Sequence, residues 1–198
     1  RGSDPTDPGS FILGVEDLTP GAFRVTELMV DPQACTDTNG EYVEVVYVGP
    51  ARVDIGGIVL YDGTNTRTLS GLLVVSPGDR LVFAQSLAGF AGCYGFNAWG
   101  QTGFGFGNSG DIFGMRYATT TIAEVDFTAW TIVGGFAYDL DDVDNTTWCL
   151  SPDALLNGDR GSPGTANGAC AGGALPGLAS LQPGDLKITE VMVDPSGC

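Results

Sequence analysis

The sequence predicts an all-β protein, built as a sandwich of short strands. Apolar and polar residues alternate over short stretches, as in residues 41–48. Turn signals such as Asp62-Gly63 and Pro77-Gly78 separate these stretches, at intervals typical of sandwiches (about 8 to 12 residues). Glycine occurs 31 times in 198 residues, charged residues make up 16%, and 43% hydrophobic residues suffice for a core. This composition favours many tight turns over a helical fold.

Each element is expected where alternation or an apolar run meets a turn signal. The first strand is expected over residues 22–30, residues 36–40 form a turn, and 86–94 is the one short helix. Further strands are expected over residues 41–48, 58–61, 72–75, 80–84, 111–117, 122–127, 130–132 and 148–150. The pair 111–117 and 122–127 reads as a hairpin around residues 118–121.

The first strand carries a carboxylate among apolar neighbours. Alternation places Phe23, Val25, Glu27 and Met29 on one face, with Arg24, Thr26 and Leu28 on the other. A catalytic carboxylate is one interpretation of Glu27. A structural group held by backbone N–H donors is the commoner explanation.

This strand returns near the other end of the chain. Residues 18–35 align with residues 181–198 at an offset of 163, with ten of the 18 positions identical. We therefore expect residues 1–19 to be a linker or the end of a preceding repeat, and residues 20–170 to be the complete sandwich. Residues 171–184 form a Gly/Ala/Pro linker, and residues 185–198 are the first strand of a second repeat or a donated strand.

The cysteine count fits this repeat. Cysteines occur at 35, 93, 149, 170 and 198, and Cys198 is the copy of Cys35. The other four allow three connectivities, of which we favour Cys35–Cys93 and Cys149–Cys170. Bridged cysteines indicate an oxidising compartment, so we expect a secreted or cell-surface protein.

Charge and composition exclude several classes of function. The net charge of −16 disfavours nucleic acid and anionic membranes as partners. The absence of histidine excludes Ser-His-Asp and Cys-His catalysis and imidazole metal sites. No apolar run is long enough to predict a membrane span.

Seven segments, in order along residues 22–167, resemble a known family. They are 25–32, 40–45, 54–60, 77–83, 106–113, 148–149 and 161–167, and the most specific reads Phe-Gly-Asn-Ser-Gly-Asp-Ile-Phe over 106–113. Together they resemble the bacterial-type lamin-tail domain. The resemblance implies an immunoglobulin-like β-sandwich with at most one short helix, and it transfers no catalytic residue. The basic surface that some members use for nucleic acid is missing, since eight Lys and Arg face 24 acidic residues.

Residues 138–145 hold the densest group of acids. Asp139, Asp141, Asp142 and Asp144 provide the carboxylates that Ca²⁺ prefers. The spacing departs from the EF-hand loop, since no glycine stands at the sixth position and no glutamate at the twelfth. The sequence therefore predicts either a weak Ca²⁺ site or a solvated acidic loop.

Two other groups have functional and structural interpretations. Glu41 and Glu44 could form a glycosidase-like pair, but three residues apart on one strand they point to opposite faces. Tyr94, Phe96 and Trp99 could form a sugar-binding platform, although aromatic residues in such loops more often close the end of a sandwich.

We expect a non-catalytic structural or adhesive module of a secreted or surface repeat protein. The alternative is an accessory module that binds Ca²⁺, glycan or protein beside a secreted enzyme. Residues 186–193 alternate like a strand, so they can pair with another copy of the chain or with a neighbouring repeat, at a vacant edge or first-strand groove. Head-to-tail contacts of this kind can build a filament.

Overall fold

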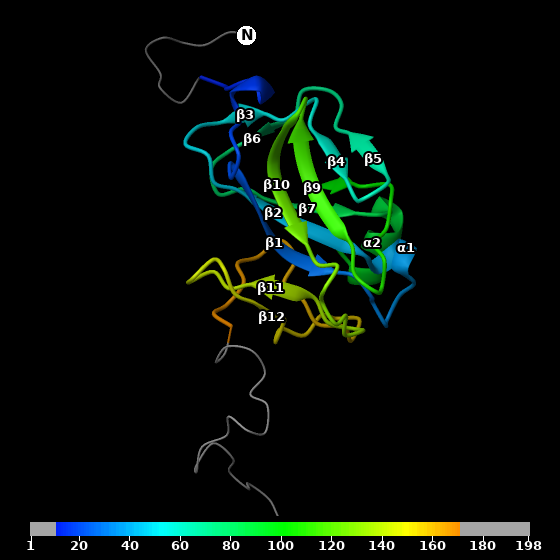
Figure 1. Cartoon of the computed structure of the whole chain (residues 1–198). Coiled ribbons are helices and arrows are strands. Elements are labelled where there is room, and N and C mark those ends of the chain that lie inside the picture. Colours follow the sequence, from blue (N-terminus) through cyan, green and yellow to red (C-terminus); the bar gives the residue numbers. More distant parts are fainter. Residues whose placement is uncertain (1–10, 171–198) are drawn as a thin grey trace, which may run out of the picture.

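The computed structural model describes residues 11–170, which form a β-sandwich (Figure 1). The six-stranded sheet has the order β12-β11-β1-β2-β7-β8. Its strands are β1 (Phe23–Met29), β2 (Tyr42–Tyr47), β7 (Arg80–Ala84), β8 (Gly100–Gln101), β11 (Tyr138–Leu140) and β12 (Trp148–Leu150). Every pairing in it is antiparallel except β7 with β8.

The opposing sheet has the order β10-β9-β4-β5. Its strands are β4 (Val59–Tyr61), β5 (Thr66–Thr68), β9 (Ile112–Tyr117) and β10 (Thr120–Asp126). A two-stranded ribbon, β3 (Val53–Asp54) with β6 (Val74–Val75), lies at one end, near the 3-10 turn Val15–Asp17. The helices are α1 (Asp37–Gly40) and α2 (Leu87–Tyr94). The predicted all-β sandwich is therefore confirmed.

The main core lies between the two larger sheets. Leu28, Val43 and Phe83 enter it from the six-stranded sheet, and Leu60, Phe113 and Met115 from the four-stranded sheet, all fully buried. Alternate residues of a strand point to opposite faces, so each sheet contributes every second residue. Burying each such side chain stabilises the fold by about 1.5–3 kcal/mol.

Helix α2 covers part of the outer face of the six-stranded sheet. Phe90 and Tyr94 contact Tyr42 edge to face, each with ring centroids 5.7 Å apart. The helix begins after Ser86, whose side chain accepts a hydrogen bond from the Gly89 N–H, and ends at Gly95 in a left-handed conformation. The helix expected over residues 86–94 is confirmed.

A bulge in β1 reverses the expected pattern of its side chains. The register between β1 and β2 shifts between Val25 and Glu27, so one extra residue is inserted there. Phe23 and Val25 face the main core, but after the bulge Leu28 takes that direction, and Met29 packs under α2. The prediction that Glu27 and Met29 share a face with Phe23 and Val25 is wrong, because strict alternation cannot anticipate a bulge.

Several element predictions need correction. Residues 130–132 form no strand: the Trp130 N–H donates to the Phe127 carbonyl in a turn, and the Trp130 ring packs against Tyr138 and Trp148. Residues 36–40 contain the short helix α1 in place of a simple turn. Strands β5 and β11 escaped prediction, because β5 is wholly exposed and β11 carries an acid at its centre.

Two disulfides join distant parts of the chain, Cys35–Cys93 and Cys149–Cys170, as the sequence predicted. The first links the segment after β1 to α2, and the second links β12 to the last described residue. They indicate an oxidising environment. Within residues 11–170, neither helix is long and apolar enough to cross a membrane.

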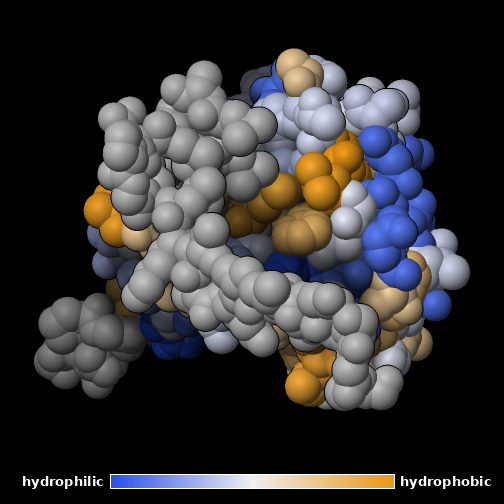
Figure 2. All heavy atoms as spheres, turned by 90° about the horizontal axis from the view of Figure 1, so that it is seen from below, coloured by the Kyte–Doolittle hydropathy of each residue, from blue (hydrophilic) through white to orange (hydrophobic). Residues whose placement is uncertain are grey.

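The molecular end at β11 and β12 has a mixed surface. Hydrophobic atoms gather there in separate patches bordered by hydrophilic residues (Figure 2). Residues 1–10 of the segment predicted as a linker over 1–19, the linker at 171–184 and the repeated strand lie outside the described part of the chain. The described rest of the first segment packs on the sandwich, since Leu13 bridges to Val53 and Val15 and Leu18 are buried in the main core.

Candidate functional sites

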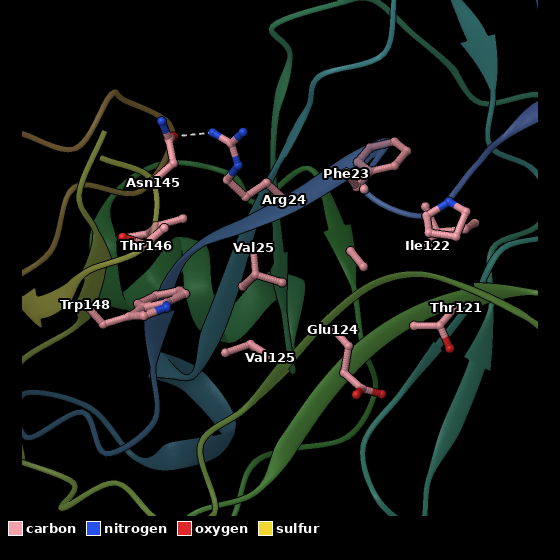
Figure 3. Close-up of a pocket in the computed structure, with 14 residues that line it drawn as sticks. Phe23, Arg24, Val25, Thr121, Ile122, Glu124, Val125, Asn145, Thr146 and Trp148 are labelled. Atoms are coloured by element: carbon pink, nitrogen blue, oxygen red, sulfur yellow. Dashed lines mark hydrogen bonds between the residues drawn. The ribbon is translucent and has the colours of Figure 1, made fainter. Parts of the chain in front are cut away.

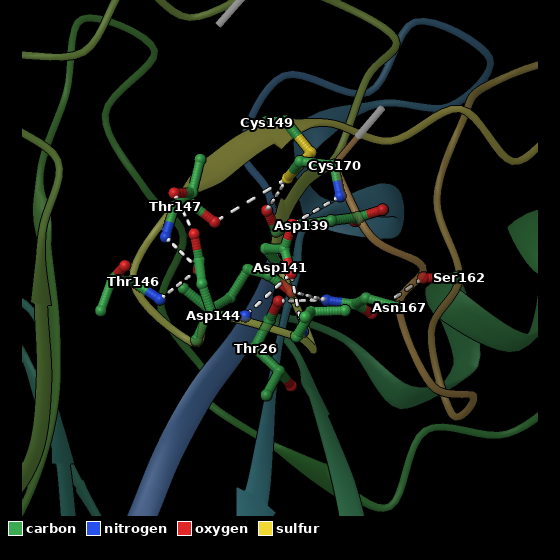
Figure 4. Close-up of a disulfide and its surroundings, with 12 residues drawn as sticks. Thr26, Asp139, Asp141, Asp144, Thr146, Thr147, Cys149, Ser162, Asn167 and Cys170 are labelled. Carbon is green, nitrogen blue, oxygen red and sulfur yellow. Dashed lines mark hydrogen bonds between the residues drawn. A yellow bond between two sulfur atoms is a disulfide. The ribbon is translucent and has the colours of Figure 1, made fainter. Parts of the chain in front are cut away.

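The four aspartates proposed for Ca²⁺ do not share one loop (Figure 4). Asp139 lies in β11 and is buried, which corrects its placement in a solvated loop. Asp141, Asp142 and Asp144 follow in the turn between β11 and β12. The strand pairing of Asp139 with Glu27 on β1 takes it into the sheet, away from the turn.

Two carboxylates in this turn accept hydrogen bonds from backbone N–H groups. Asp141 accepts hydrogen bonds from the N–H groups of Val143 (2.6 Å), Cys170 (2.8 Å) and Asp144 (3.1 Å), and these bonds lower its pKa, the Val143 bond most. Asp144 accepts from Thr147 and Thr146, and the bond from the Thr147 hydroxyl is the largest cause that lowers its pKa to about 2. Both carboxylates therefore stabilise the turn itself.

Asp142 points to a different partner. Its carboxylate lies 2.9 Å from the guanidinium of Arg80, which also contacts Glu44 at 2.6 Å. Across residues 11–170, no group of three or more acidic or cysteine side chains is arranged to hold a metal ion. Ca²⁺ binding at the four aspartates stays a prediction.

A row of buried carboxylates crosses the six-stranded sheet. Glu27 on β1 is the register partner of both Asp139 on β11 and Glu44 on β2, and all three are at most 2% exposed. Burial, followed by the charge of Asp139, raises the pKa of Glu27 to about 8. Burial likewise raises the pKa of Asp139 to about 7.

The closing segment, residues 161–167, covers this row and is hydrogen-bonded to it. Glu27 accepts a hydrogen bond from the Ser162 N–H at 2.7 Å, and Glu44 accepts one from the Gly164 N–H at 2.7 Å. The side-chain amide of Asn167 donates to the carbonyls of Thr26 (2.6 Å) and Leu140 (3.1 Å). A backbone N–H therefore holds Glu27, as its structural interpretation expected.

The closing segment needs its glycine where it passes Glu27. A Cβ added to Gly161 would stand 2.3 Å from the Tyr42 hydroxyl oxygen and 2.8 Å from a Glu27 carboxylate oxygen. The Tyr42 hydroxyl itself donates to Glu27 at 2.5 Å. No sequence signal indicated that Glu44 and Asp139 lie beside Glu27, because the register between strands brings them together.

Glu41 and Glu44 occupy separate surroundings, which agrees with their expected failure as a catalytic pair. Glu41 accepts a hydrogen bond from the Phe106 N–H at 3.1 Å, and burial raises its pKa to about 8. Glu44 instead contacts Arg80 and the closing segment.

A groove of about 500 Å³ lies where β10 faces β1 and β12 (Figure 3). Apolar side chains from both sheets line it, namely Phe23, Val25, Ile122, Val125, Leu140 and Trp148. Arg24 and Asn145 lie together at one side and are hydrogen-bonded, while Glu124 lies along β10. Sequence reasoning missed this groove, since β1 and β10, which line it, are far apart in the sequence.

Strand β10 is also the edge of its sheet. It pairs with β9 on one side, and on its other side the Gly21 N–H donates to the Ile122 carbonyl at 2.8 Å. Within residues 11–170 no strand pairs with this second side. Beside the groove, β10 therefore offers backbone groups to an added strand.

The three aromatic residues proposed as a platform separate. Tyr94 is buried and donates to the Gly40 carbonyl at 2.8 Å, and Phe96 packs edge to face on Phe90. Trp99 stands apart from them, 39% exposed, against Phe83. The interpretation as a closing lid fits Tyr94 and Phe96, and Trp99 is left available.

Comparison with known protein families finds no family model that matches this chain, and a search of curated proteins finds no match either.

Proposed function

We propose that this chain is a non-catalytic structural module of a secreted or surface protein, and that its copies or neighbouring repeats associate by strand addition. In this proposal residues 186–193 of one copy pair with the open side of β10 in another. The module is an immunoglobulin-like sandwich of lamin-tail type. The single observation that carries the proposal is a seven-residue edge strand beside an apolar groove.

The repeated segment has the chemistry that this site requires. Leu186, Ile188 and Met192 alternate along residues 186–193 and can place apolar side chains in the groove. The same segment carries Lys187 and Glu190, which complement Glu124 and Arg24 beside the groove. Backbone pairing would supply affinity, and these side chains would supply register.

The position of the first strand is not open to a donated copy. In the described chain, β1 already pairs with β11 on one side and with β2 on the other. The expected first-strand groove is therefore filled, which leaves an edge as the docking place. Among the edge strands, β10 is the longest, with seven residues.

A non-catalytic role agrees with how the acidic residues are used. Glu27 and Glu44 are fully buried under the closing segment, where backbone N–H groups hold them. A substrate could reach them only if residues 161–167 moved away. The buried carboxylates thus serve the fold.

The test compares the chain with a variant that lacks residues 185–198, by multi-angle light scattering over a range of concentrations. The full chain should form particles that grow with concentration, and the shortened chain should be monomeric. A full chain that is already monomeric would contradict the proposal, and so would assembly that survives the deletion.

A further inference from the structure

A second hollow lies at the opposite lateral edge of the sandwich, between β5 and β8. Its volume is about 390 Å³, within the range of small-molecule sites. The side chains that line it include Arg67, Thr68, Ser70, Leu73, Trp99 and Gln101. It lies on the side of the sandwich away from β10, and strand addition at β10 does not use it.

Trp99 presents a fixed aromatic surface to this hollow. Its backbone N–H donates to the Val82 carbonyl at 2.8 Å, which ties it to β7. Its ring meets Phe83 edge to face, with centroids 5.4 Å apart and planes at 74°. A Cβ at Gly100 would lie 2.8 Å from the Phe83 ring, so glycine permits this close approach. The ring is thus positioned before any ligand arrives.

Polar groups with free hydrogen-bonding capacity surround the ring. The exposed guanidinium of Arg67 and the hydroxyls of Thr68 and Ser70 have no hydrogen-bond or ion-pair partner among residues 11–170. The Gln101 side-chain nitrogen donates to the Gln85 carbonyl at 2.9 Å, which leaves its oxygen as an acceptor. The hollow therefore combines one apolar face with several donors and acceptors.

We infer that this hollow binds a neutral saccharide, with Trp99 stacked on the C–H face of one sugar ring. A pyranose presents an apolar face and a rim of hydroxyls, which matches an aromatic surface surrounded by hydrogen-bonding groups. Arg67 donates to the sugar hydroxyls, and the hydroxyls of Thr68 and Ser70 complete the rim.

Two other ligand classes fit less well. The net charge of −16 repels polyanionic glycans, although Arg67 is the one charged residue lining the hollow. A peptide strand would find a short template, since β8 has two residues and β5 has three. A neutral saccharide needs neither a long backbone edge nor a positive field.

The inference is tested by affinity electrophoresis of the full chain in gels that contain soluble neutral polysaccharides: mixed-linkage β-glucan, xyloglucan, xylan or galactomannan. We expect at least one of them to slow the chain. Trp99→Ala should reduce the binding constant at least tenfold and Arg67→Ala several-fold. Phe11→Ala, which removes an exposed aromatic ring that does not line the hollow, should leave binding unchanged.

Circular dichroism of each variant separates loss of binding from loss of fold, and exposed Arg67 offers a change with no core side chain removed. Three outcomes would overturn the inference: no retardation by any of these glycans, retardation unaffected by both substitutions, or retardation by polygalacturonate alone.

Discussion

The two lateral edges of the sandwich differ in both backbone and side chains. At one, β10 offers a seven-residue backbone beside a groove walled by apolar residues. At the other, β5 and β8 are short, and the hollow between them is lined by an exposed tryptophan and polar groups. A long edge favours recognition through main-chain bonds, while a short edge leaves recognition to side chains.

Removal of the disulfides should have the largest effects on stability. Cys35–Cys93 holds α2, whereas Cys149–Cys170 holds β12, which borders the groove beside β10. Replacing Cys35 and Cys93 by serine opens a separation of 58 residues, and replacing Cys149 and Cys170 opens one of 21. The free energy of unfolding should fall by roughly 4 and 3 kcal/mol respectively. Urea titration measures both, and the second pair alone should also weaken assembly, because Trp148 beside Cys149 lines the groove.

Alkylation of the unreduced protein followed by intact mass provides the matching control. None of these four cysteines should take up reagent. Labelling of all four would show that neither disulfide forms.

The strands β1 and β11 contain the buried acids Glu27 and Asp139, so the stability of the fold should depend on pH. The pKa values of Glu27 and Glu41 are raised to about 8, and that of Asp139 to about 7. The folded chain then binds more protons than the unfolded chain between about pH 4 and 8, and stability falls as the pH rises through that window. The expected loss from pH 5 to pH 8 is roughly 3 kcal/mol for each of these groups taken singly.

Asp139→Asn should reduce this slope, since an amide carries no charge. Asp79→Asn removes an exposed acid whose charge causes none of these pKa shifts, so it should leave the slope unchanged. Urea unfolding at pH 5, 6.5 and 8 measures the slope. Stability that rises steadily toward pH 8 would show that the buried carboxylates are ionised in the fold.

A charge reversal on β10 should separate the two edges with a smaller effect. Glu124→Lys places a positive charge where Lys187 of the added strand is proposed to lie, so association should weaken about two- to fivefold at low salt. Saccharide binding at the other edge should not change. Asp37→Lys, an equal reversal at an exposed position outside the groove, should leave both unchanged. Equal weakening by the two reversals would mean that net charge, and not the groove, governs association.

The smallest expected effect concerns Ca²⁺ at Asp141, Asp142 and Asp144. Backbone donors and Arg80 already satisfy these carboxylates, so a bound ion would have to compete with them. We expect the melting temperature to rise by about 1–2 °C in millimolar Ca²⁺ relative to chelator, since weak binding contributes little free energy. Asp144→Asn should abolish the shift, and an unchanged melt of the parent chain would end the prediction.

The sequence predicted local features better than features set by pairing. Residues 80–84 matched β7, and Ser86 capped the predicted helix, because alternation and capping are local signals. The bulge at Val25 and Glu27, the row Glu27–Glu44–Asp139 and the groove beside β10 depend on register between distant strands. Alternation within one strand indicates which residues share a face, but it shows neither the partner strand nor the position of a bulge.

The most direct test of the docking site uses hydrogen exchange. A peptide of residues 185–198 is added to the chain that lacks them, and exchange is followed by mass spectrometry. We predict protection over residues 120–126, with residues 66–68 and 100–101 unchanged. Protection at β5 and β8, or no protection at saturating peptide, would contradict strand addition at β10.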